Sequence, residues 1–357
     1  MLVYICVIVI VIVILLSLFF IITIAVTRSN NKLLITTDPS TDPSTNRNKE
    51  TIFVSIASYR DSQCPMTIKN LYDKADHPEL IYVGLIQQNA DTDADCEYEN
   101  ANNKNIPVNH LFVKRLSYQQ AEGPTMARYL ASQLYQNQDF FLEIDSHMRF
   151  LAHWDTELIK YYHIYQKQFN TDKIVLSHYP LEYNVEKNKF TDNYDQYTTS
   201  GCNNFFNQNN IIQPGYQMVS SIEPPKYYRN YIIGCQMLFG PRIMVKLVPF
   251  DPDLSYLFHG EELLYSVRLF CAGFIILSPP KNLIFHYYGR EKYPKIWTDN
   301  KDFSTKNFQI TQRVGRSLLL DKSYGSGVKY APSPECVKKF YQEAQIDIHN
   351  KKVNTRC

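Results

Sequence analysis

Asp145 and His147 are the residues whose type and spacing most clearly suit chemistry, and they follow an apolar run that begins at Phe140. In a strand, alternate side chains share one face, so the carboxylate and the imidazole are expected to point the same way. They would then lie at the carboxyl edge of a sheet, where open α/β sheets bind ligands. Mixed oxygen and nitrogen donors suit a divalent metal such as Mn²⁺, and a metal there commonly serves a diphosphate. The pattern predicts a metal site and favours nucleotide-sugar transfer as the hypothesis to test.

A simpler interpretation of the same motif exists. Asp-x-His is a short pattern, and Ser146 can cap the helix that is expected to follow it. His147 can equally be a partly buried histidine whose hydrogen bonds are all satisfied within the fold. The surrounding elements therefore have to decide between the two interpretations.

Those elements alternate between strands and helices. Apolar runs predict strands over residues 52–57, 80–86, 110–116, 140–145 and 173–178, and the intervening periodicity predicts helices over 65–74, 123–135 and 156–168. Such alternation is typical of a mainly parallel sheet covered by helices, so we expect an α/β fold.

The second half of the chain is less regular. Residues 183–228 are rich in Asn, Gln, Pro and Tyr and are expected to be irregular. A loop of this length inside a compact domain is more often functional than accidental. Further on, we expect a strand over 231–240, an amphipathic helix over 260–272 and short strands over 274–277 and 283–285.

The N-terminal segment differs in kind from the rest. Residues 2–26 carry no charge and are almost wholly apolar, which is long enough to cross roughly 30 Å of hydrocarbon. A cleaved signal peptide has a basic start and a shorter apolar core, so we expect residues 1–27 to be an uncleaved signal anchor, a single transmembrane helix. Residues 28–50, with a tandem Asp-Pro-Ser-Thr, have the composition of a stem or linker.

The composition of the chain limits which partners and which cellular compartment can be expected. The net charge of +2 on 357 residues gives no electrostatic argument for nucleic acid, so none is expected as a partner. Arg28 and Lys32 follow the anchor closely, and the positive-inside rule alone would place the rest of the chain in the cytoplasm. Anchored sugar transferases usually have the opposite orientation, and we expect a lumenal ER or Golgi domain with the cytoplasmic orientation kept open. The eight cysteines permit disulfides but do not fix their pairing.

Four motifs together carry a resemblance to a known family. They are Ile52–Asp61 (IFVSIASYRD), Gly123–Arg128 (GPTMAR), Glu143–Asp155 (EIDSHMRFLAHWD) and His259–Glu262 (HGEE). With them, the chain resembles the polypeptide α-N-acetylglucosaminyltransferases, and more distantly the animal polypeptide N-acetylgalactosaminyltransferases. The match covers roughly residues 51–297.

The resemblance implies a GT-A glycosyltransferase fold, with a catalytic domain over residues 51–330 and a C-terminal tail over 331–357. It implies that the metal, Mn²⁺ or Mg²⁺, is held by Asp145, His147 and a later histidine. By the order of its elements, that histidine is His286 in this sequence. Alternatively, His286 simply stacks in the aromatic cluster around it.

Further roles are implied in the same way. Ser58, Arg60 and Arg128, with Asp145, would contact the UDP-sugar donor. Glu261 and Glu262 would meet sugar hydroxyls or the acceptor, and Trp297 would seal the site from a loop over 290–300 that closes on the donor. The bland alternatives are a surface ion pair for Arg60, a helix-face charge for Arg128, ordinary packing for Trp297 and a favourable helix dipole for the two glutamates.

The resulting expectation is a retaining, metal-dependent transfer of N-acetylglucosamine from UDP-GlcNAc to a Thr, Ser or hydroxyproline hydroxyl of a polypeptide. Met148 and Arg149 stand where the animal relatives have Cys-Glu, and no lectin domain follows, which disfavours acetylgalactosamine transfer. The alternatives are a glycan or lipid acceptor, a hydrolase of nucleotide sugars, and a membrane-anchored binding protein with a degenerate site.

Overall fold

The computed structural model describes residues 49–97, 106–107, 109–208, 211–318 and 328–354. The expected anchor over 1–27 and all but the last two residues of the expected stem lie outside these ranges. Within them, no helix has both the length and the apolar character that crossing a bilayer requires. The account below concerns residues 50–357, which form one structural unit.

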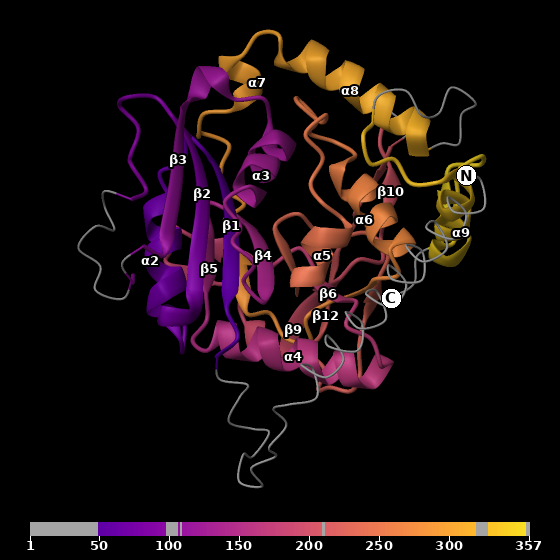
Figure 1. Ribbon diagram of the computed structural model, residues 1–357, viewed down its shortest axis with the longest axis horizontal. Helices are drawn as coiled ribbons and strands as arrows, with labels where there is room; N and C mark the ends of the chain where they lie inside the picture. The colour runs from indigo at the N-terminus through magenta and orange to yellow at the C-terminus, as the bar shows by residue number, and fades with distance from the viewer. Residues whose placement is uncertain (1–48, 98–105, 108, 209–210, 319–327, 355–357) are drawn as a thin grey trace, which may run out of the picture. The chain divides into compact units, whose positions relative to one another are not determined.

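An eight-stranded mixed sheet forms the centre of this unit, in the order β13-β15-β6-β14-β4-β1-β2-β3 (Figure 1). Its first half is parallel and consists of β1 (Ile52–Tyr59), β2 (Ile81–Asn89), β3 (Leu111–Ser117) and β4 (Phe140–Asp145). The second half consists of β6 (Ile174–Ser177), β13 (Arg229–Asn230), β14 (Met237–Pro241) and β15 (Ile275–Leu277). Strand β14 runs antiparallel to both β4 and β6. The mainly parallel α/β sheet predicted from the sequence is confirmed.

Helices cover the sheet where the chain crosses between strands, and proline opens two of them. The described α-helices between residues 64 and 271 are α2 (Cys64–Asp73), α3 (Pro124–Ser132), α4 (Trp154–Phe169), α5 (Arg242–Leu247) and α6 (Glu261–Cys271). Proline stands in the first turn of both α2 and α3, where its fixed φ suits a helix and no amide hydrogen is required. Helix α3 packs on β1 and β2, and α4 packs on β6. Single-turn 3₁₀ segments lie at Pro78–Leu80, Tyr118–Gln120 and Tyr194–Gln196.

A small antiparallel ladder stands beside the main sheet and completes the candidate site. It pairs β5 (Met148–Phe150) with β16 (Ile284–His286), and Met148 lies opposite His286. The chain therefore leaves β4 at Asp145, turns through Ser146 and His147, and begins a new strand at once. The expectation that His147 continues the same strand as Asp145 is wrong, because β4 ends at Asp145 and His147 lies in the turn.

The irregular stretch contains more local order than its composition suggested. Short antiparallel pairs join β7 (Tyr183–Asn184) to β8 (Lys189–Phe190), β9 (Tyr197–Ser200) to β12 (Gln217–Ser220), and β10 (Phe205–Phe206) to β11 (Ile212–Gln213). The strand expected over 231–240 is confirmed only in its second half. The chain bridges at Gly234 and Met237 before it enters β14, so the apolar character of Tyr231–Cys235 reflects burial and not strand pairing.

The C-terminal residues pack onto α6, in contrast to the separate tail expected over 331–357. They follow α7 (Ile296–Asp299) and α8 (Phe303–Leu318) and include α9 (Pro334–Ala344), β17 (Ile346–Asp347) and β18 (Lys352–Val353). A disulfide joins Cys271 at the end of α6 to Cys336 in α9, and Phe340 is buried against α6 residues. A second disulfide joins Cys64 to Cys96. The polar composition of this segment concealed an amphipathic helix with one buried face.

Candidate active site

A pocket of about 430 Å³ lies at the carboxyl edge of the parallel strands. Ala57 in β1 stands in register with Asp145 in β4, and Cys235 lies just before the antiparallel β14, so three neighbouring strands meet the pocket at one edge. Helix α6 and the segment after β16 supply the facing residues. This is the location predicted from the Asp-x-His motif.

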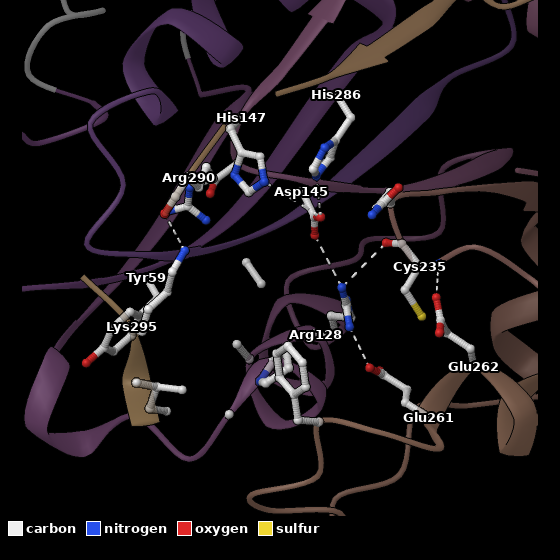
Figure 2. Close-up of a pocket in the computed structure, with 18 of the residues that line it drawn as sticks. Tyr59, Arg128, Asp145, His147, Cys235, Glu261, Glu262, His286, Arg290 and Lys295 are labelled. Atoms are coloured by element: carbon white, nitrogen blue, oxygen red, sulfur yellow. Dashed lines mark hydrogen bonds and ion pairs between the residues drawn. The ribbon is translucent and has the colours of Figure 1, made fainter. Parts of the chain in front are cut away.

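Asp145, His147 and His286 converge in the pocket (Figure 2). One potential ligand atom from each lies within 4.8 Å of the others. The Nε2 of His286 is 3.2 Å from Oδ2 of Asp145, and the Nε2 of His147 is 3.9 Å from the same oxygen. The structure thus brings together all three residues that were predicted to hold a metal.

The protonation states of this group favour metal ligation. Burial lowers the pKa of His286 to about 4, so its imidazole is neutral at pH 7. Burial opposes the ionisation of Asp145, but the hydrogen bond from His286 and the charges of His147 and Arg128 lower its pKa below the ordinary value. A neutral imidazole and an ionised carboxylate are the forms that bind a metal ion.

Asp61, which the sequence analysis did not single out, supports His147 from behind. Its Oδ2 lies 2.7 Å from Nδ1 of His147 and accepts a hydrogen bond from the Ser146 hydroxyl at 2.6 Å. Burial opposes ionisation here too, but these contacts and the charges of His147 and Arg290 lower the pKa of Asp61 to about 2. An ionised carboxylate only accepts hydrogen bonds, so Nδ1 of His147 carries a hydrogen, and Nε2 is the ring nitrogen that faces Asp145.

These observations test whether the residues fit a divalent metal ion, and they do. The donor set offers one carboxylate oxygen and two imidazole nitrogens, all converging on one point. His286 places Nε2 there, whereas its Nδ1 is buried without a hydrogen-bond partner among the described residues.

Arg128 lies beneath the metal-ligand group and is surrounded by carboxylates. Its guanidinium pairs with Asp145 at 3.2 Å and with Glu261 (Figure 2). It also pairs with Glu143 at 3.1 Å. Burial favours the neutral form of Arg128, but the three carboxylates outweigh it and raise its pKa well above the ordinary value. Arg128 lines the pocket, as expected of a donor-binding residue, but in this structure it binds carboxylates and so fixes the orientation of Asp145 and Glu261.

Glu262 occupies a different environment from its neighbour Glu261. It accepts hydrogen bonds from the Tyr179 hydroxyl and from the backbone N–H of Cys235, the latter at 3.2 Å. Burial raises the pKa of Glu262 to about 7. Both predicted glutamates line the pocket, and both are already held by protein donors.

The segment after β16 crosses the pocket and is tied to the end of β1. The Nη2 of Arg290 is 3.4 Å from Oδ2 of Asp61, and Asp299 accepts hydrogen bonds from Tyr59 and Arg60 at 2.8 and 3.0 Å. Between these ties, Lys295 lines the pocket and donates to the backbone oxygen of Arg290. The segment predicted to close over the donor therefore lies along the pocket and is held at both ends.

We call Phe258, Tyr288 and Trp297 the aromatic rim. These side chains are 40%, 41% and 44% exposed and line the pocket. The rings of Phe258 and Trp297 meet edge to face, with centroids 5.2 Å apart. Trp297 is thus at the mouth of the pocket, where it can contact a ligand.

Two predicted donor contacts do not reach the pocket. Ser58 is buried, because alternation along β1 turns Ala57 and Tyr59 toward the pocket and Ser58 away from it. Arg60 is held by Asp93 at 2.9 Å and by Asp299, and its guanidinium lies over the Tyr118 ring. Among the described residues, neither lines the pocket, and their contact with the donor stays a prediction.

Asp61, Arg290 and Lys295 are functional candidates that sequence reasoning missed. A signal existed for Asp61, which follows directly on a buried strand at the sheet edge. For Arg290 and Lys295, the signal was a pair of cations within a few residues of the proposed ligand His286.

The fold and the site define a glycosyltransferase with the GT-A architecture. The chain belongs to the family described as "Glycosyltransferase (GlcNAc)", whose model matches residues 51–110 and 97–346. No curated protein matches the chain.

A solved structure shares the fold at low sequence identity. GalNAc-T7 with UDP, GalNAc and Mn²⁺ superposes with a TM-score of 0.51 at 15% identity, over 86% of this chain and 55% of that one. The chain thus spans about half the length of GalNAc-T7. TarS 1–349 of S. aureus in complex with UDP-GlcNAc gives a TM-score of 0.47 at 13% identity, over 82% and 71% of the two chains.

Proposed function

We propose that this glycosyltransferase transfers N-acetylglucosamine from UDP-GlcNAc to a hydroxyl group of a polypeptide, with retention of configuration and with a divalent metal ion. The convergence of Asp145, His147 and His286 in the pocket carries the proposal. The family description names GlcNAc, and the GalNAc-T7 structure contains a uridine diphosphate and Mn²⁺. UDP-GlcNAc and Mn²⁺ are therefore the donor and the metal to test first.

The charges in the pocket suit the departure of a diphosphate. A bound metal ion would supply Lewis-acid stabilisation of the negative charge that develops on the leaving group. Arg290 and Lys295 add two cations of the chain's own on the segment that crosses the pocket. Burial and the nearby Arg290 lower the pKa of Lys295, and a bound anion would favour its charged form. These two residues would bind phosphate oxygens and hold UDP in place as the bond to the sugar breaks.

The carboxylates of the pocket favour attack on the same face of the sugar from which UDP departs. Glu261 is engaged by Arg128, and Glu262 by Tyr179 and the Cys235 N–H. Neither is free to form a covalent sugar intermediate in this arrangement. The acceptor hydroxyl would then bond to the anomeric carbon as the bond to phosphate breaks, and its proton would pass to a phosphate oxygen of UDP.

The acceptor would enter past the aromatic rim. Phe258 and Trp297 also line a neighbouring cleft of about 250 Å³ with Asn307 and Ser304, which offer hydrogen-bonding groups without charge. An extended polypeptide, with apolar side chains and backbone amides, suits such a surface. The exposed indole also suits the face of a sugar ring, so a glycan is the second candidate acceptor.

The compartment that suits this chain is an oxidising lumen. The Cys64–Cys96 and Cys271–Cys336 disulfides support that location, because disulfides persist in secretory compartments and are rare in the cytosol. Together with the apolar segment over 1–27, they favour a single-pass protein whose catalytic domain lies in the ER or Golgi lumen.

The test is turnover of UDP-sugars by the full chain, purified in detergent with Mn²⁺ or with a chelator. A panel of UDP-sugars is offered with Thr-rich peptides, hydroxyproline-containing peptides and oligosaccharides, in parallel with Asp145→Ala. We expect peptide-dependent consumption of UDP-GlcNAc that the chelator and the variant both abolish. Oligosaccharide-dependent turnover would replace the polypeptide with a glycan acceptor. Release of UDP that no acceptor accelerates would indicate a hydrolase and contradict the proposal.

A further inference from the structure

One buried carboxylate connects three separate parts of the site. Asp61 lies two residues beyond the end of β1, and its side chain is 0% exposed. A single oxygen, Oδ2, contacts the Ser146 hydroxyl, Nδ1 of His147 and Nη2 of Arg290, at 2.6, 2.7 and 3.4 Å. Its other oxygen, Oδ1, accepts the backbone N–H of Gln63 at 2.9 Å. Both oxygens therefore face donors, which is the environment of an ionised carboxylate.

This environment fixes the tautomer of His147. The short contact from Oδ2 falls on Nδ1, so that nitrogen must carry a hydrogen, and Nε2, which is directed toward Asp145, is the nitrogen left to bind a metal ion. If a group that donates a hydrogen bond stood in place of Asp61, Nδ1 of His147 would accept that bond. The neutral ring would then carry its hydrogen on Nε2, which would block Nε2 as a ligand.

We propose that Asp61 is the positioning residue of the metal site: it holds His147 in the ligating tautomer and anchors Arg290 beside it. The presence of a metal ion rests on the proposed function, whereas the tautomer of His147 follows from its contact with Asp61. Outer carboxylates that orient a ligating histidine typically account for a 10–100-fold effect on metal affinity.

The alternative is a purely structural role at the start of α2, where Asp61 also forms a turn with Gln63. Asp155 offers a matched control for that role. It is equally buried, and its carboxylate accepts the backbone N–H groups of Asp76 and His77, both at 2.9 Å, outside the pocket. Loss of either carboxylate removes hydrogen bonds to backbone amides, but only loss of Asp61 affects His147.

The test measures Mn²⁺ affinity without any turnover. The full chain and its variants Asp61→Asn, Asp155→Asn and Arg290→Gln are each titrated with Mn²⁺. The concentration of free Mn²⁺ is measured by its electron paramagnetic resonance signal. We expect Asp61→Asn to weaken Mn²⁺ binding by about 10–100-fold. Asp155→Asn should leave it within about twofold, because it keeps the His147 contact, and Arg290→Gln reports how much the nearby cation contributes.

A second measurement needs no variant of Asp61 and covers the case in which Asp61→Asn fails to fold. Histidine ¹⁵N shifts of the metal-free protein, assigned by comparison with His147→Gln, report the tautomer directly. Hydrogen on Nδ1 of the neutral His147 ring supports the proposal, and a neutral ring with hydrogen on Nε2 and none on Nδ1 overturns it.

The metal-dependent function and the positioning role of Asp61 can be contradicted separately. If the wild-type chain binds no Mn²⁺, the metal-dependent function is wrong, and the ¹⁵N shifts still decide the role of Asp61. If the wild-type chain binds Mn²⁺ and Asp61→Asn binds it equally well, Asp61 is a structural residue only. Weakened binding in Asp155→Asn to the same degree would also contradict a specific role for Asp61.

Discussion

The two sides of the pocket are built in different ways. We call Arg128, Asp145, His147, Glu261 and His286 the charged floor; they are mostly buried and bound to one another. The aromatic rim, in contrast, is about two-fifths exposed and joined mainly by ring contacts. The floor is preorganised by ion pairs between the end of β4 and the helices α3 and α6. In the rim, Phe258 and Tyr288 lie on connecting segments, which can adapt to a ligand, and Trp297 lies on the short helix α7. The donor side should therefore be intolerant of substitution and the acceptor side more tolerant.

Removal of Arg128, the central cation of the charged floor, should have the largest effect on the free energy of unfolding. Arg128→Met would leave Asp145 and Glu261 buried without their partner, and we expect a loss of about 3–5 kcal/mol in the free energy of unfolding. Urea unfolding would measure it. The control is Arg115→Met, whose partners Asp95 and Glu97 are on the surface, with an expected loss below about 1 kcal/mol. Equal losses of stability in the two variants would show that the ion pairs of the charged floor contribute no more than those of a surface network.

Removing the carboxylate ligand should affect chemistry more than stability. Asp145→Asn retains the shape of the side chain but loses the charge, and we expect kcat to fall by about 10³-fold, equivalent to about 4 kcal/mol. Steady-state turnover of UDP-GlcNAc measures this change, with circular dichroism to show that the variant is folded. Wild-type kcat in a folded variant would exclude Asp145 from catalysis.

Glu262 lies between the floor and the rim and should make stability depend on pH. Its folded pKa of about 7 is raised above the unfolded value near 4.5, so the folded state prefers the protonated form. The resulting stabilisation is present below about pH 4.5 and is lost as pH rises through 7. Relative to wild type, Glu262→Gln should gain roughly 1–3 kcal/mol between pH 5 and 8, as followed by urea unfolding. A difference independent of pH would place Glu262 in a more solvated environment.

The rim should show the smallest effect, confined to the acceptor. Trp297→Ala removes an exposed ring, and we expect the acceptor KM to rise about tenfold, with the donor KM unchanged and stability within about 0.5 kcal/mol. Phe308→Ala, an exposed ring on α8 outside the pocket lining, should change neither constant. A raised donor KM in Trp297→Ala would assign the indole to the donor side.

The sequence was most informative where regular elements determine position. The apolar runs predicted β1, β2, β3 and β4, and the order of motifs placed His286 beside Asp145, because strand ends converge at one sheet edge. Prediction was weaker where a side chain's partners come from distant segments. Whether Arg60 reaches the pocket depends on Asp93 and Asp299, and neither contact has a local pattern.

Two further differences have the same origin. Ser58 was chosen by residue type, but the alternation of β1 relative to the pocket depends on where the strand ends, which the sequence does not specify to one residue. The packing of α9 on α6 involves a disulfide whose pairing was not evident from spacing, so the C-terminal segment appeared to be a polar tail. Asp61 was overlooked because its partners become visible only in three dimensions.

The β5–β16 ladder has a consequence for how the site forms during synthesis and folding. Asp145 and His286 are separated by 141 residues, so their contact requires one of the longer loop closures in the chain. A nascent chain exposes Asp145 and His147 well before His286 has been made, and a ladder between such distant strands forms slowly. Asp145, His147 and His286 therefore come together only once nearly the whole catalytic domain is present, and the site is a late product of folding.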